Sequence, residues 1–164
     1  MSERTVKHDT IGVERNFQAS PRRVFAAWED PKAHGRWYVP GDDWELAEYE
    51  NDFRVGGRQM SRFGPKGDTK YFSDGSYLDI VQDVRIISAG TMHEGKTRIS
   101  TTLCTVELLA EGTGTRLVLT DQSAFFDGRE TPSERKSGWE ANAGHDWKPK
   151  RREDSTVVTS RWLQ

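Results

Sequence analysis

Apolar and polar residues alternate along most of this chain, which is the pattern of β-strands that bury one face. In the first such stretch, Ile11, Val13 and Phe17 alternate with more polar residues. The pattern predicts seven strands, over residues 10–18, 44–52, 58–63, 69–81, 84–92, 97–110 and 115–126. Short turns join most of the later strands, so we expect sequential antiparallel neighbours, a meander. A sheet of this length coils and presents one concave face.

Two helix starts interrupt this pattern after the first strand. Ser20-Pro21 is an N-cap followed by a proline at the first helical position, and Asp30-Pro31 repeats the arrangement. Between them, Val24, Phe25 and Trp28 recur at helical spacing, so the first helix has one apolar face. The sequence thus predicts two short helices after strand one.

A third helix is predicted near the end of the chain. Thr131-Pro132-Ser133-Glu134 combines an N-cap, a first-turn proline and the glutamate of a capping box. Trp139, Ala143 and Trp147 form its apolar stripe, and Pro149 stops or kinks it. These boundaries predict a polar leader over residues 1–9, one domain over residues 10–147, and a charged, disordered tail over residues 148–164.

Two positions break the regular strand pattern. Gly75 indicates a bulge or bend, because the pattern resumes at Tyr77. Asp121 and Gln122 interrupt an otherwise apolar strand, and successive residues point to opposite faces, so one of the two must face the interior. A buried polar group needs a partner from the protein, water or a ligand.

Charge and composition exclude several classes of partner. The 164 residues carry a net charge of -2, and no basic stripe appears outside residues 148–152, so a nucleic-acid surface is not indicated. No apolar stretch approaches the roughly 18 residues of a membrane span, and residues 1–9 lack the apolar region of a signal peptide. The single cysteine, Cys104, cannot form an internal disulfide, which favours a reducing cytoplasm.

The sequence holds no motif of a metal or catalytic centre. Its four histidines are scattered and none has a partner at metal-ligand spacing, so no metal or other cofactor is predicted. The Gly-x-Ser-x-Gly pattern of a nucleophile elbow is absent. Tyr77 and Cys104 have no evident activating base, so no catalytic residue is assigned.

Aromatic residues are the stronger signal, because they come from separate elements that the predicted sheet would gather around one interior. An apolar cavity with a few polar groups is the usual form of a small-molecule site, although the same rings could simply fill a core. The candidate ligand-binding residues are Phe25, Trp28, Trp37, Tyr38, Met60, Phe72, Tyr77, Cys104, Gln122 and Trp139.

The order of the predicted elements resembles the α+β helix-grip fold of the START/Bet v-like superfamily. Within it, the chain is similar to the branch named for the activator of heat-shock-protein ATPase. The matching motifs are Ala19–Trp28, Asp30-Pro31 with Arg36-Trp37, Gly56-Gly57-Arg58, Gly75-Ser76-Tyr77, Gly114–Thr120 and Gly138-Trp139-Glu140. The resemblance implies a curved antiparallel sheet around a long C-terminal helix, with a cavity between them. Some superfamily relatives bind lipids or other apolar molecules, and others cyclise polyketides.

The resemblance leaves three functions to weigh. The first is a protein that binds a small apolar molecule in the cavity, as a monomer or a homodimer. The second is a polyketide-cyclase-like enzyme, and the third is a chaperone ATPase co-regulator, which rests on the family name alone. After Glu140 the chain departs from the family, because large aliphatic residues at helical spacing are missing. Two explanations stay open: a C-terminus replaced by a reading-frame shift, or a divergent member with a shortened helix.

Overall fold

All seven predicted strands are present in the computed structural model, which describes residues 4–32, 34 and 42–144. They are β1 (Val6–Phe17), β2 (Trp44–Asn51), β3 (Arg58–Pro65), β4 (Tyr71–Val81), β5 (Arg85–Glu94), β6 (Thr97–Glu111) and β7 (Gly114–Phe126). Their order in the sheet is β1-β7-β6-β5-β4-β3-β2, and every neighbouring pair is antiparallel. Strands β2 to β7 therefore form the predicted meander, and β1 lies at the edge beside β7.

The helices begin where the capping residues predict. Helix α1 spans Pro21–Glu29, and the Ser20 hydroxyl accepts a hydrogen bond from the backbone N–H of Arg23 at 3.4 Å. Helix α3 spans Pro132–Gly144. Its capping box is reciprocal: the Thr131 N–H donates to the Glu134 carboxylate at 2.8 Å, and the Glu134 N–H donates to the Thr131 hydroxyl at 3.2 Å.

Asp30 ends α1 and begins a second helical segment. Its carboxylate accepts from the Lys32 N–H at 3.0 Å, and its carbonyl accepts from the His34 N–H at 2.9 Å. Pro31, Lys32 and His34 are helical, and the rest of this predicted helix lies outside the described residues.

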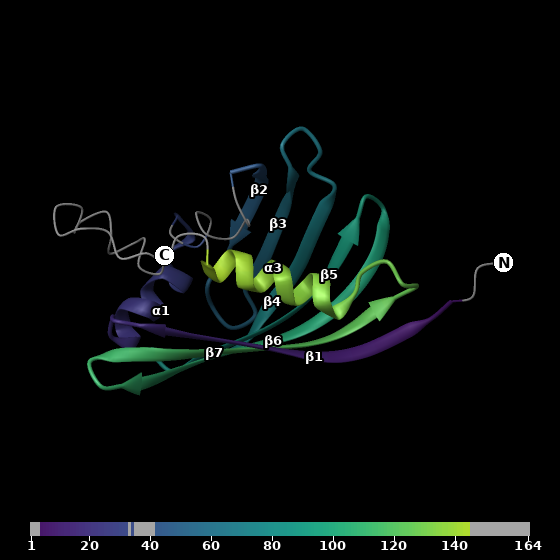
Figure 1. Cartoon of the computed structure of the whole chain (residues 1–164). Coiled ribbons are helices and arrows are strands. Elements are labelled where there is room, and N and C mark those ends of the chain that lie inside the picture. Colours follow the sequence, from purple (N-terminus) through teal and green to yellow (C-terminus); the bar gives the residue numbers. More distant parts are fainter. Residues whose placement is uncertain (1–3, 33, 35–41, 145–164) are drawn as a thin grey trace.

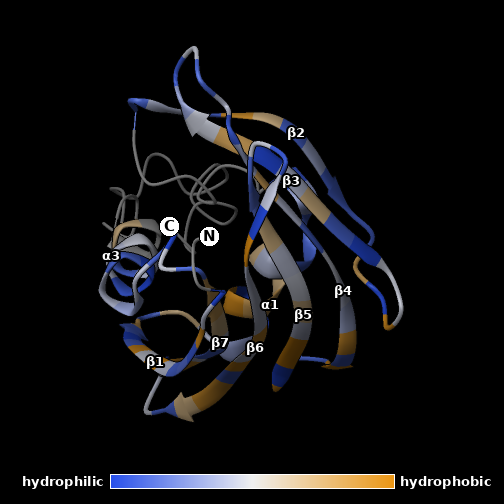
Figure 2. Ribbon diagram, turned by 90° about the vertical axis from the view of Figure 1, so that its right-hand side faces the viewer, coloured by the Kyte–Doolittle hydropathy of each residue, from blue (hydrophilic) through white to orange (hydrophobic). Residues whose placement is uncertain are grey.

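The sheet curls around α3, and α1 lies near the C-terminal end of that helix (Figures 1 and 2). We call the side of the sheet that holds α3 the concave face and the opposite side the outer face. This arrangement confirms the α+β helix-grip fold. Among the described residues, neither helix has the length and apolarity that a membrane span requires.

The core fills the half of the fold formed by β1, β7, β6 and α1. Buried side chains from these elements make one cluster that includes Ile11, Val13, Phe17, Val24, Phe25, Val106, Leu108, Leu117, Leu119 and Phe125. Trp139 of α3 packs against this cluster. The hydrophobic core thus anchors one half of the sheet, while the concave face of β2 to β5 is lined mainly by half-buried residues.

Two local features differ from the sequence prediction. β1 begins at Val6, so residues 6–9 of the predicted leader are strand: Val6 pairs with Phe126, and the long β7 supplies backbone partners to this end. The β4 register shift lies between Tyr77 and Asp79, beyond Gly75. Gly75 instead faces Gly90 of β5, and a Cβ at position 75 would lie 2.4 Å from the Ala89 carbonyl oxygen. The glycine therefore permits close approach of two backbones.

Candidate functional site

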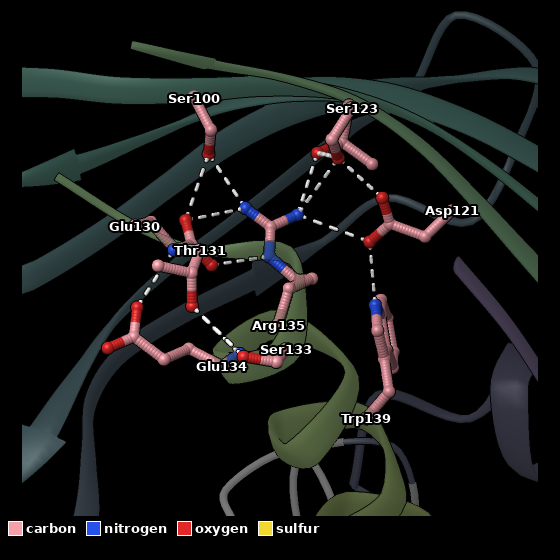
Figure 3. Close-up of polar contacts among 10 residues, drawn as sticks. Ser100, Asp121, Ser123, Glu130, Thr131, Ser133, Glu134, Arg135 and Trp139 are labelled. Carbon is pink, nitrogen blue, oxygen red and sulfur yellow. Dashed lines mark hydrogen bonds and ion pairs between the residues drawn. The ribbon is translucent and has the colours of Figure 1, made fainter. Parts of the chain in front are cut away.

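A buried cation attaches α3 to the concave face of the sheet. Arg135 donates to both carboxylate oxygens of Glu130, from Nε at 2.6 Å and from Nη2 at 2.8 Å. Its Nη2 also donates to the Ser100 hydroxyl at 2.7 Å, and its Nη1 donates to the Thr102 hydroxyl at 2.8 Å. The side chain is 11% exposed. Figure 3 shows the guanidinium surrounded by oxygen atoms from β6, β7 and the segment before α3.

Asp121 of β7 completes this network. Its side chain is fully buried, and its Oδ2 accepts from Arg135 Nη1 at 3.2 Å and from Trp139 Nε1 at 2.7 Å (Figure 3). Its Oδ1 accepts from the Ser123 hydroxyl. Arg135 and Trp139 are four residues apart, so one face of α3 presents both donors to one carboxylate. Both oxygens of Asp121 are therefore engaged: Oδ2 holds the helix, and Oδ1 accepts from a neighbour on the same strand.

Opposing effects act on the pKa of Arg135. Burial alone lowers it, because the charged form loses its hydration. The hydrogen bond and charge of Glu130, followed by the charge and hydrogen bond of Asp121, outweigh burial and raise the pKa of Arg135 above its ordinary value. Arg135 is thus a permanent cation between two carboxylates.

A second polar contact lies at the far side of the concave face, where β2 ends. The Tyr77 hydroxyl of β4 donates to Asn51 Oδ1 of β2 at 2.5 Å. The Phe53 ring packs edge-on against the Tyr77 ring, with centroids 5.0 Å apart, and against Phe25 of α1, with centroids 5.6 Å apart. This contact joins α1 to the strands opposite α3.

Half-buried aromatic rings line the concave face near the other end of β2. The Trp44 ring stacks on the Tyr71 ring with centroids 5.8 Å apart, and the Phe63 ring lies 5.7 Å from Tyr71. Cross-strand partners share a face, and Phe63 pairs with Tyr71. The rings therefore form one wall above β2, β3 and β4.

Short side chains occupy the sheet between these aromatic groups. The register places Ser73, Gly75, Ser88 and Gly90 on the same face as the buried Tyr77. Ser88 pairs with Tyr77 on one side and with Cys104 on the other. The floor of the concave face in β4 and β5 thus carries side chains of two heavy atoms or fewer at these four positions.

Cys104 lies on this face with a thiol that stays protonated. Burial, with a smaller contribution from the charge of Asp121 on the neighbouring strand, raises the pKa of Cys104 to about 12 against the opposing charge of Arg135. The thiolate is the reactive form of cysteine, so Cys104 is not suited to act as a nucleophile at neutral pH.

His34 is buried beside the end of α1. Its Nδ1 lies 2.6 Å from the Tyr49 hydroxyl, and its ring lies 5.4 Å from the Trp28 ring. Burial lowers the pKa of His34 to about 3, so the ring is neutral at physiological pH. Across the described ranges, no three His, Cys, Asp or Glu side chains gather as metal ligands.

The structure brings together half of the ligand-binding residues predicted from the sequence. Phe25 and Trp28 of α1, Tyr77 of β4, Cys104 of β6 and Trp139 of α3 all belong to or pack against the interior cluster. Trp37 and Tyr38 lie outside the described residues.

Three predicted residues face away from the interior, and for them the prediction of an interior position was wrong. Met60 and Phe72 share the outer face of β3 and β4 with the Arg58–Asp74 ion pair, and the Arg62 guanidinium lies 5.0 Å from the centre of the Phe72 ring. Gln122 is exposed. Asp121 occupies the inward position of that strand, because Arg135 and Trp139 supply the partners that a buried carboxylate requires.

The outer face also carries an open groove. It has a volume of about 680 Å³ and is lined by residues of β1, β5, β6 and β7, Gln122 among them. The register places Gln122 opposite Leu103 and Thr10, on the side of the sheet away from α3. Gln122 therefore belongs to this groove and not to the concave face.

Sequence reasoning missed Arg135, Glu130 and Asn51 as members of the site. The available signal for Arg135 was its position four residues before Trp139 in the helix that the Thr131 capping box begins. That spacing places the two side chains on one helix face.

Comparisons with known proteins agree with this architecture. Among solved structures, the Mll3558 protein from Rhizobium loti is 42% identical with a TM-score of 0.77, and the match covers 84% of this chain and 94% of that chain. An uncharacterized protein from Rhizobium leguminosarum is 31% identical with a TM-score of 0.78, over 98% of this chain and 97% of that chain. An AHSA1-like protein from Aeromonas hydrophila, 21% identical with a TM-score of 0.65 over 95% and 96% of the two chains, shares the fold.

A comparison with curated proteins gives no match. The family model described as Activator of Hsp90 ATPase homolog 1-like protein matches residues 18–145, which include α1, β2 to β7 and α3. The match extends over most of the chain, and the solved structure that is 31% identical spans nearly all of it. The chain therefore belongs to the family of Activator of Hsp90 ATPase homolog 1-like proteins.

Proposed function

We propose that this protein binds a small, largely apolar molecule on the concave face, over the short side chains of β4 and β5. The observation that carries the proposal is the composition of that face. The centre of the face carries short side chains, those of Ser73, Gly75, Ser88 and Gly90. Half-buried aromatic rings lie beside them. Small-molecule sites are concave and mostly apolar, with a few oriented polar groups.

The polar groups around this floor favour binding over catalysis. Tyr77 donates its hydroxyl hydrogen to Asn51, and the Asp121 carboxylate accepts from Arg135, Trp139 and Ser123. The Cys104 thiol is protonated because burial raises its pKa. A general acid or base must be poised to exchange a proton with substrate. These groups instead hold parts of the protein together, which supports a binding module over the cyclase-like alternative.

The test uses N-phenyl-1-naphthylamine, a neutral apolar dye that fluoresces when it leaves water. The full chain is expected to bind the dye saturably, and native mass spectrometry of protein as purified is expected to detect a bound small molecule. Ser88→Phe fills the concave floor and should abolish dye binding. Ala89→Phe is the matched control, because Ala89 is the next residue along β5 and lies on the outer face opposite Leu103.

The two variants separate the concave face from the outer groove. Loss of dye binding in Ala89→Phe but not in Ser88→Phe would assign binding to the outer groove and refute the proposal. Absence of saturable dye binding, of co-purified adducts and of binding across a panel of lipids and polyketides would refute it as well. Thermal unfolding of both variants checks that each remains folded.

A further inference from the structure

The Asn51 amide sits at the concave face with its orientation fixed by Tyr77. Asn51 is the last residue of β2 and pairs with Gln59. Two residues earlier, Tyr49 pairs with the fully buried Ser61, so Asn51 lies on the same face of the sheet as that pair. The Tyr77 hydroxyl donates to Asn51 Oδ1 at 2.5 Å. Tyr77 is itself 2% exposed and is held by the edge of the Phe53 ring. The amide oxygen is therefore occupied, and the amide nitrogen points elsewhere.

The nitrogen of this amide is buried without an acceptor. Among the described residues, Asn51 Nδ2 has no hydrogen-bond partner although it is closed off from solvent. Buried donors in folded proteins are nearly always paired, since leaving one unpaired costs free energy. Asn51 Oδ1 already accepts from Tyr77, and the described residues supply no acceptor to Nδ2, so an acceptor from outside the protein is the simplest match for it.

We propose that Asn51 determines ligand specificity by donating a hydrogen bond from Nδ2 to an oxygen of the bound molecule, an inference that rests on the proposed function above. Tyr77 is its positioning residue. A side-chain amide nitrogen only donates, so the ligand must present an acceptor oxygen. A ligand with an acceptor oxygen would pair the buried Nδ2, whereas a ligand without one would leave it unpaired and bind more weakly.

The charges around Arg135 narrow the class of ligand to neutral compounds. Arg135 is the cation of the α3 network, and its guanidinium already contacts the carboxylates of Glu130 and Asp121. One positive and two negative groups leave this network with an excess of one negative charge. A carboxylate ligand would meet that charge, whereas a ketone or an ester would not. The ligand class is therefore a neutral, apolar molecule that carries an acceptor oxygen, and ketones and esters belong to it.

The experiment compares two probes of nearly equal shape. 2-Acetylnaphthalene carries a carbonyl oxygen, and 2-isopropenylnaphthalene carries a CH₂ group in its place. Dissociation constants are measured by displacement of N-phenyl-1-naphthylamine from the wild-type protein, Asn51→Leu, Asn51→Asp and the control Asn16→Leu, whose exposed site lies on β1. The difference in hydration between the probes cancels when the ratio of the two constants is compared between proteins.

In the wild-type protein and in Asn16→Leu this ratio is expected to favour the ketone about tenfold more than it does in Asn51→Leu or Asn51→Asp. Tyr77→Phe frees the amide to rotate and should reduce the preference partway. The infrared carbonyl stretch of bound, ¹³C-labelled 2-acetylnaphthalene gives an independent readout. It should lie at lower frequency in the wild-type protein than in Asn51→Leu or, if that variant fails to fold, in Asn51→Asp.

Three outcomes would overturn the inference, and they differ in what they say of the proposed function. Equal probe ratios in the wild-type protein and both Asn51 variants, with dye still bound, leave the binding site in place and remove Asn51 as its donor. An unshifted carbonyl stretch does the same. If neither naphthalene nor the dye binds the wild-type protein, the proposed function fails and the inference fails with it.

Discussion

The guanidinium of Arg135 on α3 lies 3.2 Å from the carboxylate of Asp121 on β7. The exposed fractions of the two side chains are 11% and 0%, so this ion pair is shielded from solvent. Helix α3 has a weak apolar stripe, and its polar contacts with the sheet take on much of the role that aliphatic packing has in a strongly amphipathic helix. The Arg135–Asp121 pair should therefore control whether α3 stays on the concave face.

Removing Arg135 tests this relationship. Arg135→Met leaves Asp121 as an unpaired buried charge, so the free energy of unfolding should fall by about 3–5 kcal/mol in urea denaturation. Arg116→Met is the control, because the Arg116–Glu14 pair is 39% and 60% exposed and such surface pairs contribute at most about 1 kcal/mol. Adding Asp121→Asn to Arg135→Met should recover part of the loss. Equal losses in the Arg135 and Arg116 variants would contradict the proposed role of the buried pair.

The stability of the protein should depend on pH through His34. Burial holds the pKa of His34 at about 3 in the folded protein, compared with 6.5 in the unfolded chain. As the pH falls below 6.5, the unfolded state binds the proton first, so the folded state loses about 1.4 kcal/mol per pH unit down to the folded pKa. This contribution is fully present above pH 6.5.

His34→Gln removes the titrating group and isolates this effect. Urea denaturation of both proteins from pH 7.5 to 4.5 should show wild-type stability falling more steeply than that of the variant, with the divergence beginning near pH 6.5. Parallel pH profiles would mean that the ring is accessible to protons in the folded protein. Other acidic groups titrate in both proteins and cancel in the comparison.

The sequence was sufficient for the described elements and their order, because caps and alternation are local signals. Ser20 and Thr131 start helices through hydrogen bonds within three residues of themselves, and sequence shows such partners directly. It was harder to predict which face of the sheet each side chain of β3 and β4 lies on. Phe72 lies on the outer face beneath Arg62, and the guanidinium contact makes a half-buried ring acceptable there.

The polar members of the site could not be predicted for a different reason. Asn51 and Tyr77 are 26 residues apart, and their contact depends on the register of β2, β3 and β4 together. The rule that one of Asp121 and Gln122 faces inward was correct, yet the choice between them required knowing that α3 brings Arg135 over β7. Partners from distant elements decide such choices, and their positions follow only from the assembled fold.

The glycine pair of β4 and β5 should be intolerant of a single methyl group. A Cβ on Gly75 would lie 2.4 Å from the Ala89 carbonyl oxygen, and one on Gly90 would lie 2.6 Å from the Asp74 carbonyl oxygen. These neighbours are backbone atoms, so the strands themselves must move. Gly75→Ala and Gly90→Ala should each lower the free energy of unfolding by about 2 kcal/mol or more, within the range of overpacking costs.

Gly12→Ala is the matched control for the glycine pair. Gly12 is also a strand residue, but a Cβ there would meet nothing within 4 Å. Alanine restricts the unfolded chain more than glycine does, so this variant should be neutral or more stable by up to about 1 kcal/mol. Urea denaturation of the three variants gives the comparison, and similar values at all three positions would show that the two strands can separate without cost.

The reactivity of the Cys104 thiol should show whether α3 covers the concave face at β6. Because burial raises its pKa to about 12, its thiolate fraction at pH 8 is on the order of a thousandfold below that of an ordinary cysteine with a pKa near 8.5. Reaction with 5,5′-dithiobis(2-nitrobenzoate) should be slow in the native protein, fast in urea, and about tenfold faster for each pH unit between 8 and 10. Arg135→Met, which is expected to loosen α3 from the sheet, should react faster than wild type under native conditions. A native thiol that reacts like free cysteine, with a plateau above pH 9, would mean that α3 does not cover β6.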